Sequence, residues 1–160
     1  MTKTNAMRLL EQAKIDFTAE EYAFDENDLD GRHAADALGL EYSQVFKTLV
    51  AKDPKKRILV FCIPVDRGLD LKKAAQAAGS KSVEMLQLRE LLPTTGYIRG
   101  GCSPIGMKKK FPTFIDSSAL SQKLIAVSAG ARGVQILLSP SDLAGLVGAE
   151  FRELCTQLPL

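Results

Sequence analysis

Short apolar runs, some alternating with polar residues and some continuous, predict a series of short strands separated by short helices. The segments with a strand pattern are 17–24, 45–50, 58–63, 83–85, 113–116, 123–128 and 134–138. Apolar residues at helical spacing, with capping residues before several of them, predict helices at 5–14, 31–38 and 71–78, a helical turn at 88–92 ended by Pro93, and a last helix opened by Ser139-Pro140.

The strands at 45–50 and 58–63 are joined by a turn sequence at 53–56 and together predict an antiparallel hairpin. Because the second of these strands is almost wholly apolar, we expect it to lie in the middle of a sheet. The succession of strands with irregularly placed helices favours an α+β fold with a central mixed β-sheet, partly barrel-like, flanked by short helices. With 160 residues and no repeat, low-complexity segment or linker, the sequence predicts a single domain, 1–160.

Lys47 is the most informative charged residue of this hairpin. Both faces of the strand 45–50 are mostly apolar, so a charge there is costly unless it has a partner or a function. One interpretation is a lysine stem that lies along the apolar surface of an edge strand with its head in water. The other is a cation directed at a carbonyl, carboxylate or phosphate in a partly dry pocket, with hydroxyl donors from Thr48 or Ser128. Tyr22 could close such a pocket or belong to the core.

A second informative feature is the glycine-rich segment 100–106, which is followed by three lysines at 108–110. Its backbone N–H groups could face a carbonyl oxygen or a phosphate, with Pro104 limiting the freedom of the loop. The segment lacks the spacing and the strand–loop–helix context of a P-loop or a dinucleotide site. A plain turn is the alternative interpretation.

The totals restrict the class of protein. The net charge of +2 does not indicate a dedicated nucleic-acid coat, and the basic clusters at 52–57 and 108–110 could be local contacts or solvated loops. The sequence shows no signal peptide and no apolar run that could span a bilayer, so we expect a cytoplasmic protein without a membrane partner. Three widely spaced cysteines and one histidine argue against a zinc site of the usual kind and favour a reducing compartment.

The sequence does not indicate a nucleophile supplied by the protein. Cys102 would need a base or a cationic neighbour to form a thiolate, and His33 lies on a predicted short helix without an acid–base pattern around it. We therefore interpret Cys102 as a small apolar loop residue and His33 as a surface or capping residue. The acidic segment 25–30 is interpreted as a solvated loop.

Several motifs resemble the YbaK/prolyl-tRNA-synthetase-associated editing domain family. They are Phe46-Lys47-Thr48-Leu49, Leu69-Asp70-Leu71-Lys72-Lys73-Ala74, the segment from Thr95 to Lys109, and Ser128-Ala129-Gly130-Ala131-Arg132-Gly133. The match runs in order from the first helix to Phe151 and looks most like the free-standing YbaK branch. The resemblance implies a compact mixed-sheet α+β domain with a pocket between sheet and loops.

The resemblance also implies roles for particular residues. Lys47 matches the pocket lysine of the family, which we expect to be catalytic, and Tyr22, Thr48 and Ser128 match residues that shape the substrate pocket. The G-x-x-x-P loop of the family matches the segment from Gly100 to Pro104. In this segment we expect Gly100, Gly101, Ser103 and Pro104 to bind the substrate. Three positions depart from the pattern and put the accepted aminoacyl group in question: Asp30 where some members have an aromatic residue, Ala131 where many have lysine, and Gln135 where some have aspartate.

The activity implied by the resemblance is removal of cysteine wrongly attached to proline tRNA, with cysteine tRNA as a further candidate substrate. In the YbaK type the thiol of the substrate attacks its own ester carbonyl and releases a cyclic thioester. Such an enzyme works by orientation and oxyanion stabilisation, here by Lys47 and N–H groups around Gly101. The expected partners are the acceptor end of an aminoacyl-tRNA and, as a candidate, prolyl-tRNA synthetase, with no cofactor and no DNA.

Two other functions stay open from the sequence. One is a hydrolase of the same fold that acts on alanyl-tRNA(Pro), where water would cleave the ester. The other is a non-catalytic module that binds tRNA ends or a synthetase, for which binding without turnover is expected. The low net charge counts mildly against a strong tRNA binder.

Overall fold

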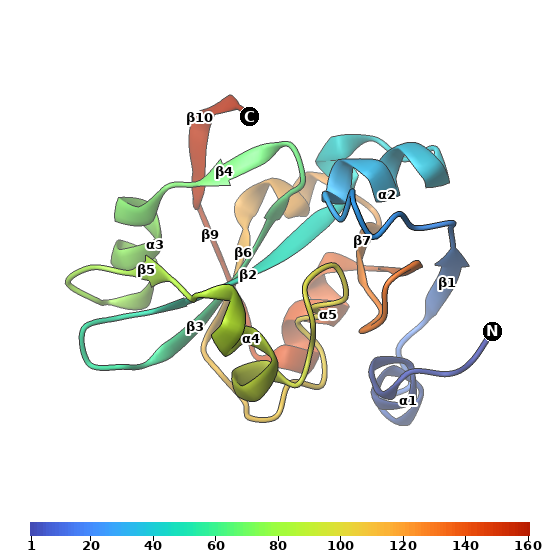
Figure 1. Cartoon of the computed structure of the whole chain (residues 1–160), viewed down its shortest axis with the longest axis horizontal. Coiled ribbons are helices and arrows are strands. Elements are labelled where there is room, and N and C mark those ends of the chain that lie inside the picture. The colour runs from blue at the N-terminus through green and yellow to red at the C-terminus, as the bar shows by residue number, and fades with distance from the viewer.

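The structure is a computed structural model that describes residues 1–160, apart from the side chain of Leu158. The elements follow in the order α1 (Asn5–Gln12), β1 (Phe17–Glu21), α2 (Gly31–Leu38), η1 (Tyr42–Gln44), β2 (Phe46–Lys52), β3 (Ile58–Pro64), β4 (Arg67–Leu69), α3 (Leu71–Ala78), β5 (Glu84–Met85), α4 (Leu88–Thr95), β6 (Thr113–Asp116), η2 (Ser117–Ser121), β7 (Ile125–Ser128), β8 (Val134–Leu138), α5 (Pro140–Val147), β9 (Glu150–Arg152) and β10 (Cys155–Pro159) (Figure 1).

The largest sheet is mixed and has the strand order β5-β2-β3-β6-β9. The predicted hairpin is confirmed, because β2 and β3 pair antiparallel from Phe46↔Pro64 to Lys52↔Ile58. On its other edge β3 pairs parallel with β6, so it lies in the middle of the sheet, as its apolar sequence predicts.

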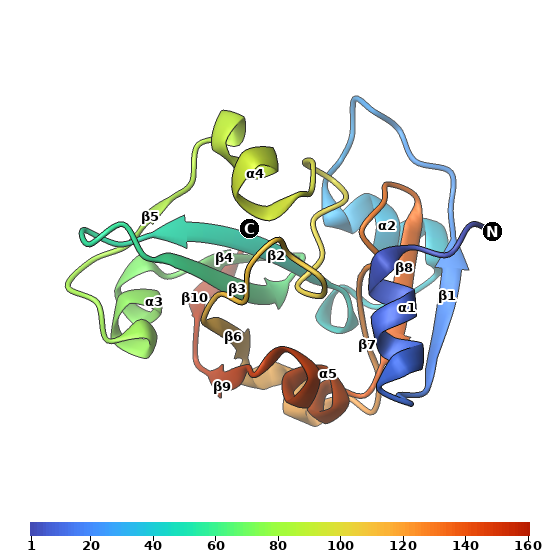
Figure 2. The same cartoon turned by 90° about the horizontal axis from the view of Figure 1, so that it is seen from below.

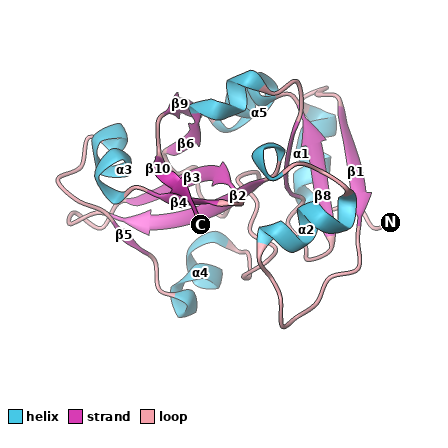
Figure 3. Ribbon diagram, turned by 90° about the horizontal axis from the view of Figure 1, so that it is seen from above, coloured by secondary structure: helices cyan, strands magenta, loops and turns pink.

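Two smaller sheets complete the fold. An antiparallel sheet has the order β1-β8-β7, and β10 pairs with β4. Helix α3 and the β1-β8-β7 sheet lie at opposite ends of the molecule (Figures 1 and 3). The α+β class with a mixed sheet is confirmed, and the strands of the described chain form no closed barrel.

The core consists of two main apolar clusters and a smaller one. In one main cluster, residues of α1 and α5 such as Leu10 and Leu143 pack with Ile125 and Ile136 of the β1-β8-β7 sheet. In the other, α3 covers β3 through residues such as Ala74 and Phe61. The smaller cluster joins α2 to β7 through Ala35 and Ala126. Since helices cover both sheets, burial of apolar area supplies most of the driving force for the fold.

Helix ends follow the capping residues of the sequence. Asp70 accepts hydrogen bonds from the N–H groups of Lys72 and Lys73 at the start of α3, and Gly79 ends this helix with a φ of +65°. Asp30 and Ser139 cap α2 and α5 in the same manner. These three helices therefore begin where the sequence predicts.

Other boundaries differ from the prediction. Strands β4, β9 and β10 are not predicted by the sequence, and β1 ends at Glu21 because its partner β8 begins at Val134. Pro93 was expected to end a helical turn, but α4 continues to Thr95. The Thr95 hydroxyl donates to Leu91 O at 2.8 Å and the Gly96 N–H donates to Leu92 O, so carbonyls of the last turn keep partners beyond the proline.

Candidate active site

A cavity of about 410 Å³ lies beside the β2 strand. Its walls come from β2, from α2 and the segment before it, from the loop after α4, and from the facing ends of β7 and β8. Helix α4 and the segment between β1 and α2 lie on the same side of β2 (Figure 2). Among the residues predicted to form the site, those that line the cavity are Tyr22, Lys47, Thr48, Gly100 and Ser128.

One edge of β2 is open where it borders this cavity. β5 pairs with β2 only at Ala51 and Lys52, and β7 forms only a bridge, Val45↔Ala126, just before the strand begins. Val45 O accepts from Val65 N–H, and Asp53 N–H donates to Arg57 O, so the odd-numbered residues direct their backbone groups toward β3. By alternation, the Thr48 N–H and C=O point to the open edge, where no described strand pairs with them.

Lys47 lies in the wall of the cavity and is half-buried. Its Nζ lies 3.5 Å from Val65 O, to which it donates. Burial lowers the pKa of the Lys47 ammonium, and the nearby Asp30 carboxylate opposes this effect. No carboxylate oxygen of the described residues forms an ion pair with Lys47. Its charge is therefore partly desolvated and has no direct counter-ion.

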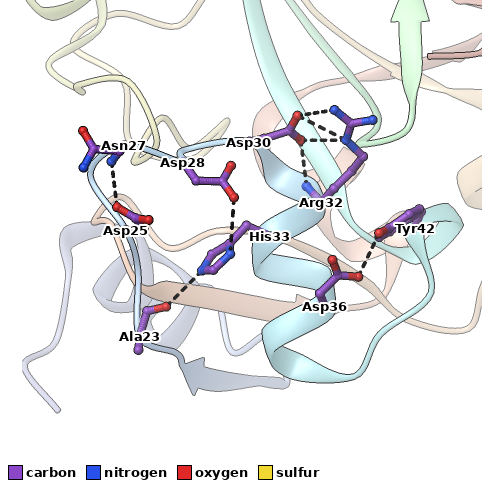
Figure 4. A network of polar contacts seen from close by, with 9 residues as sticks. All are labelled: Ala23, Asp25, Asn27, Asp28, Asp30, Arg32, His33, Asp36 and Tyr42. Atoms are coloured by element: carbon purple, nitrogen blue, oxygen red, sulfur yellow. Dashed lines mark hydrogen bonds and ion pairs between the residues drawn. The ribbon is translucent and has the colours of Figure 1, made fainter.

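The acidic segment before α2 forms part of the same cavity rather than a purely solvated loop. Asp30 is held by Arg32, whose Nη2 lies 2.7 Å from Asp30 Oδ2, and this hydrogen bond lowers the pKa of Asp30 (Figure 4). Asp28 Oδ2 lies 3.5 Å from His33 Nδ1, while His33 Nε2 lies 3.2 Å from Ala23 O. Asp28, Asp30 and His33 all line the cavity.

No local pattern in the sequence indicates this placement of the acidic segment. His33 was interpreted as a surface or capping residue; it is partly exposed, and its ring centroid lies 6.4 Å from that of Tyr22 in the cavity wall. Outside the cavity, Tyr42 of η1 donates to Oδ1 of Asp36 on α2 at 2.8 Å (Figure 4).

The glycine-rich segment contributes less to the cavity than the sequence predicts. Gly100 lines it with a φ of +84°, and a Cβ at this position would lie 2.9 Å from the Leu29 side chain, which only glycine avoids. The Gly101 N–H donates to Ile98 O at 3.0 Å and is not available to a ligand. Ser103 is fully buried, and its Oγ accepts from the Ile105 N–H at 3.2 Å.

Pro104 lies away from this cavity. It lines a second cavity of about 230 Å³ together with Leu9 of α1 and Leu146 of α5. The structure therefore brings Gly100 to the first cavity and leaves Gly101, Ser103 and Pro104 as supports of the loop. A Cβ at Gly101 would lie 3.2 Å from the Arg132 backbone nitrogen. The lack of a side chain at Gly101 therefore allows the loop to pack closely against the turn after β7.

Cys102 lines the cavity but is not activated. Burial raises the pKa of its thiol to about 12, and burial also raises the pKa of the Cys62 thiol to about 12. Both groups are therefore protonated at neutral pH, which excludes them as ready thiolate nucleophiles. The sequence-based interpretation of Cys102 as a loop residue agrees with this environment.

The remaining wall carries buried polar groups and two arginines. Ser128 Oγ accepts from the Gly130 N–H at 3.1 Å, and Gln135, its partner across β7 and β8, is 7% exposed. Arg99 and Arg132 also line the cavity, and Arg132 Nε donates to Arg99 O at 2.9 Å. The two arginines lie inside motifs that resemble the family, but their sequence alone did not distinguish them from surface residues.

The described residues contain no group of three or more His, Cys, Asp or Glu side chains arranged to hold a metal ion. No described helix has the length and apolar character needed to cross a membrane. The cavity contains the partly desolvated Lys47 ammonium and the unpaired backbone N–H of Thr48. Its wall also carries the carboxylates of Asp28 and Asp30, which can accept hydrogen bonds. Such a set can bind a polar acyl group and stabilise negative charge on its carbonyl oxygen.

Comparison with known proteins identifies relatives of this chain. A protein of Enterococcus faecalis named "Putative Cys-tRNA(Pro)/Cys-tRNA(Cys) deacylase EbsC" is 49% identical over 155 residues, which cover 97% of this chain and 94% of that protein. The "Uncharacterized protein YwhH" of Bacillus subtilis is 28% identical over 111 residues, covering 69% of this chain and 70% of that protein.

The fold has a counterpart among solved structures. A structure described as a "putative trans-editing enzyme for prolyl tRNA synthetase" superposes with a TM-score of 0.80 at 23% identity, covering 97% of this chain and 99% of that one. The family model described as "Aminoacyl-tRNA editing domain" matches residues 30–146, a range that includes Lys47, Gly100 and Ser128. The chain belongs to the aminoacyl-tRNA editing domain family.

Proposed function

We propose that this protein is a trans-editing deacylase that removes cysteine from mischarged tRNA(Pro), and also from tRNA(Cys). The observation that carries the proposal is the open edge of β2, where a partly desolvated Lys47 ammonium and the unpaired Thr48 N–H face one cavity in a member of an editing family. The 49% identity to a protein named as a deacylase of these two tRNAs supports the same substrates.

The proposed reaction uses the thiol of the substrate. Its sulfur attacks the ester carbonyl carbon, a C–S bond forms, the C–O bond to the tRNA breaks, and the thiol proton passes to the departing ribose oxygen. The products are a cyclic thioester and deacylated tRNA. During the attack, negative charge develops on the carbonyl oxygen, and the Lys47 ammonium and the Thr48 N–H donate hydrogen bonds to that oxygen.

The state of the cysteines in the protein supports this division of labour. Because the pKa values of Cys62 and Cys102 are both raised to about 12 by burial, neither thiol can compete with the substrate as a nucleophile near pH 7. The cavity then acts by holding the acyl group in a reactive orientation, which can supply a large part of the rate enhancement. Tyr22 and Ser128 shape the space around the acyl group.

We further propose that Arg99 and Arg132 contact phosphates at the acceptor end of the tRNA. Both line the cavity, and arginine pairs with phosphate through two parallel hydrogen bonds. A net charge of +2 suits such a short contact rather than a broad tRNA-binding surface, and prolyl-tRNA synthetase is the proposed source of the tRNA. Since charged tRNAs are its substrate, we place this activity in the cytoplasm.

The test is a comparison of three substrates with the purified protein. Cysteinyl-tRNA(Pro) should be deacylated, whereas S-methylcysteinyl-tRNA(Pro), in which the thiol is blocked, should persist. Release of alanine from alanyl-tRNA(Pro) at a rate similar to that of cysteine would contradict the proposal and favour the hydrolase. Binding of all three without release would indicate the non-catalytic module.

A further inference from the structure

Gln135 carries an unexplained polar atom. Among the described residues, its Oε1 is the one fully buried side-chain nitrogen or oxygen without a hydrogen-bond partner. Buried polar atoms in native proteins are nearly always paired, so an unpaired acceptor indicates that its partner lies outside the protein chain. Gln135 also lines the 410 Å³ cavity, where a bound ligand can supply that partner.

The position of Gln135 in the sheet directs its side chain toward the cavity. It lies on β8 between Glu20 of β1 and Ser128 of β7. Its neighbours in sequence, Val134 and Ile136, pack into the core with α1, so the Gln135 side chain points to the opposite face. Leu137, the next residue on that face, packs with apolar residues of α2 and β7.

The charges of the cavity indicate which ligand group would meet this acceptor. Lys47, Arg99 and Arg132 can only donate hydrogen bonds, so they suit the carbonyl and phosphate oxygens of the substrate. An aminoacyl ester also carries an α-ammonium group, which these cations repel. Of the acceptors in the wall, Asp30 is engaged by Arg32 and Asp28 faces His33. Gln135 Oε1 is the fully buried side-chain acceptor of the described residues that has no protein partner.

We propose that Gln135 Oε1 accepts a hydrogen bond from the α-ammonium group of the aminoacyl ester, so that this position selects substrates with a free α-amine. The inference rests on the proposed function. Because the amine is attached to the carbon next to the carbonyl, holding it also fixes the direction of the carbonyl relative to Lys47. Asp28 and Asp30 add a negative field to the same cavity.

The test compares cysteinyl-tRNA(Pro) with 3-mercaptopropionyl-tRNA(Pro), which keeps the thiol and the ester but lacks the amine. The wild-type protein should prefer the cysteinyl substrate by about 10-fold or more in kcat/KM. Gln135→Met, which has a similar shape but no strong acceptor, should lower kcat/KM for the cysteinyl substrate by roughly 10-fold and change the mercaptopropionyl rate less than about 2-fold.

Two further measurements separate this role from a structural one. Gln135→Met removes an unpaired buried polar atom, so its unfolding temperature should equal or exceed that of the wild type, whereas a structural hydrogen bond would make it fall. Gln135→Glu keeps an oxygen at the same reach and should retain the preference for the amine. If this variant loses the preference as completely as Gln135→Met, the inference is wrong.

The possible failures can be told apart. If the wild type releases neither acyl group, the proposed function is wrong and the inference falls with it. If the wild type is active but Gln135→Met slows both substrates equally, only the inference is wrong, and Gln135 contacts a part of the substrate that both esters share, such as a ribose hydroxyl.

Discussion

The two lysines of β2 occupy opposite ends of one strand and have different surroundings. Lys52 Nζ lies 3.5 Å from Glu90 and 3.9 Å from Glu84, and its end of the strand is paired on both edges. Lys47 has no such ion pair, lines the cavity, and lies where one edge of the strand is open. The sequence places Lys47 inside the predicted strand and Lys52 in the basic cluster after it, whereas the structure includes both in β2. Lys47 is therefore the lysine of β2 whose charge can act on a ligand in the cavity, while the charge of Lys52 is engaged by Glu84 and Glu90.

The strongest test of this comparison replaces each lysine in turn. Lys47→Ala should lower the rate of cysteinyl-tRNA(Pro) deacylation by about 100-fold or more, because a donor to the developing oxyanion is lost. Lys52→Ala should stay within about 2-fold of the wild type, since a partly exposed ion pair contributes little. Both are measured as single-turnover rates. Equal losses in the two variants, or full activity of Lys47→Ala, would refute the distinction.

The Lys52 end of the hairpin should instead control stability. Asp53, in the turn between β2 and β3, accepts from the backbone N–H groups of Lys55 and Arg57 and pairs with Arg57 at 2.8 Å. Asp53→Ala should therefore lower the thermal unfolding temperature by several degrees and leave deacylation nearly unchanged. Asp36→Ala, at a carboxylate outside the cavity, serves as the control. A loss of activity without a loss of stability would contradict the assignment.

The pH dependence of stability tests the same turn. Burial alone would raise the pKa of Asp53, but hydrogen bonds from Arg57 and Ser80 hold it at about 2, below its usual 3.8. A depressed pKa in the folded state gives stability that is present above the unfolded pKa and is lost as the pH falls through the folded one. Urea midpoints should therefore fall between pH 4 and about 2 for the wild type and change less for Asp53→Asn.

Lys47 should give a change of the same sign at high pH, where its own pKa lies. Burial lowers the pKa of its ammonium below the usual 10.5, so between the two values the unfolded chain binds more protons than the folded one. Stability should rise with pH in that interval, while activity should fall because the ammonium is lost. Replacing Lys47 with Met should remove the rise in the urea midpoint, and a rise of the same size in that variant would contradict the assignment.

The smallest expected effect concerns the Thr48 side chain. Its Oγ1 lies 3.8 Å from the buried Cys62 Sγ, a weak contact, whereas the proposed role of this residue belongs to its backbone. Thr48→Val keeps the backbone and the β-branched shape, so deacylation should change by less than about 3-fold and stability by about 1 kcal/mol or less. A loss as large as that of Lys47→Ala would transfer the role from the backbone to the hydroxyl.

Local signals in the sequence account for the parts of the fold that it predicts. The hairpin turn, the caps Asp70 and Ser139, and the apolar run of β3 depend on neighbouring residues. Strands β4, β9 and β10 were missed because they are short and their partners lie far away in the chain, as in Cys155↔Leu69. Their pairing depends on tertiary contacts that no local pattern records.

The candidate site divides in the same manner. Tyr22 lines the cavity from the segment just beyond β1. Lys47 and Thr48 line it as expected, because the regular alternation along a strand restricts where each residue points. Loop residues have no such restriction, so the sequence could not separate Gly100, which lines the cavity, from Gly101, whose N–H is engaged by Ile98 O. The places of Arg99 and Arg132 likewise follow from how two distant loops pack together.

A co-crystal structure with a stable analogue, a cysteinyl-adenosine in which an amide replaces the ester, would decide where the acyl group binds. The analogue should lie in the cavity beside β2, with its carbonyl oxygen within hydrogen-bond distance of Lys47 Nζ and the Thr48 N–H. If its carbonyl lies away from both groups, or if it binds instead in the cavity lined by Leu9 and Pro104, the proposed role of Lys47 and Thr48 is wrong.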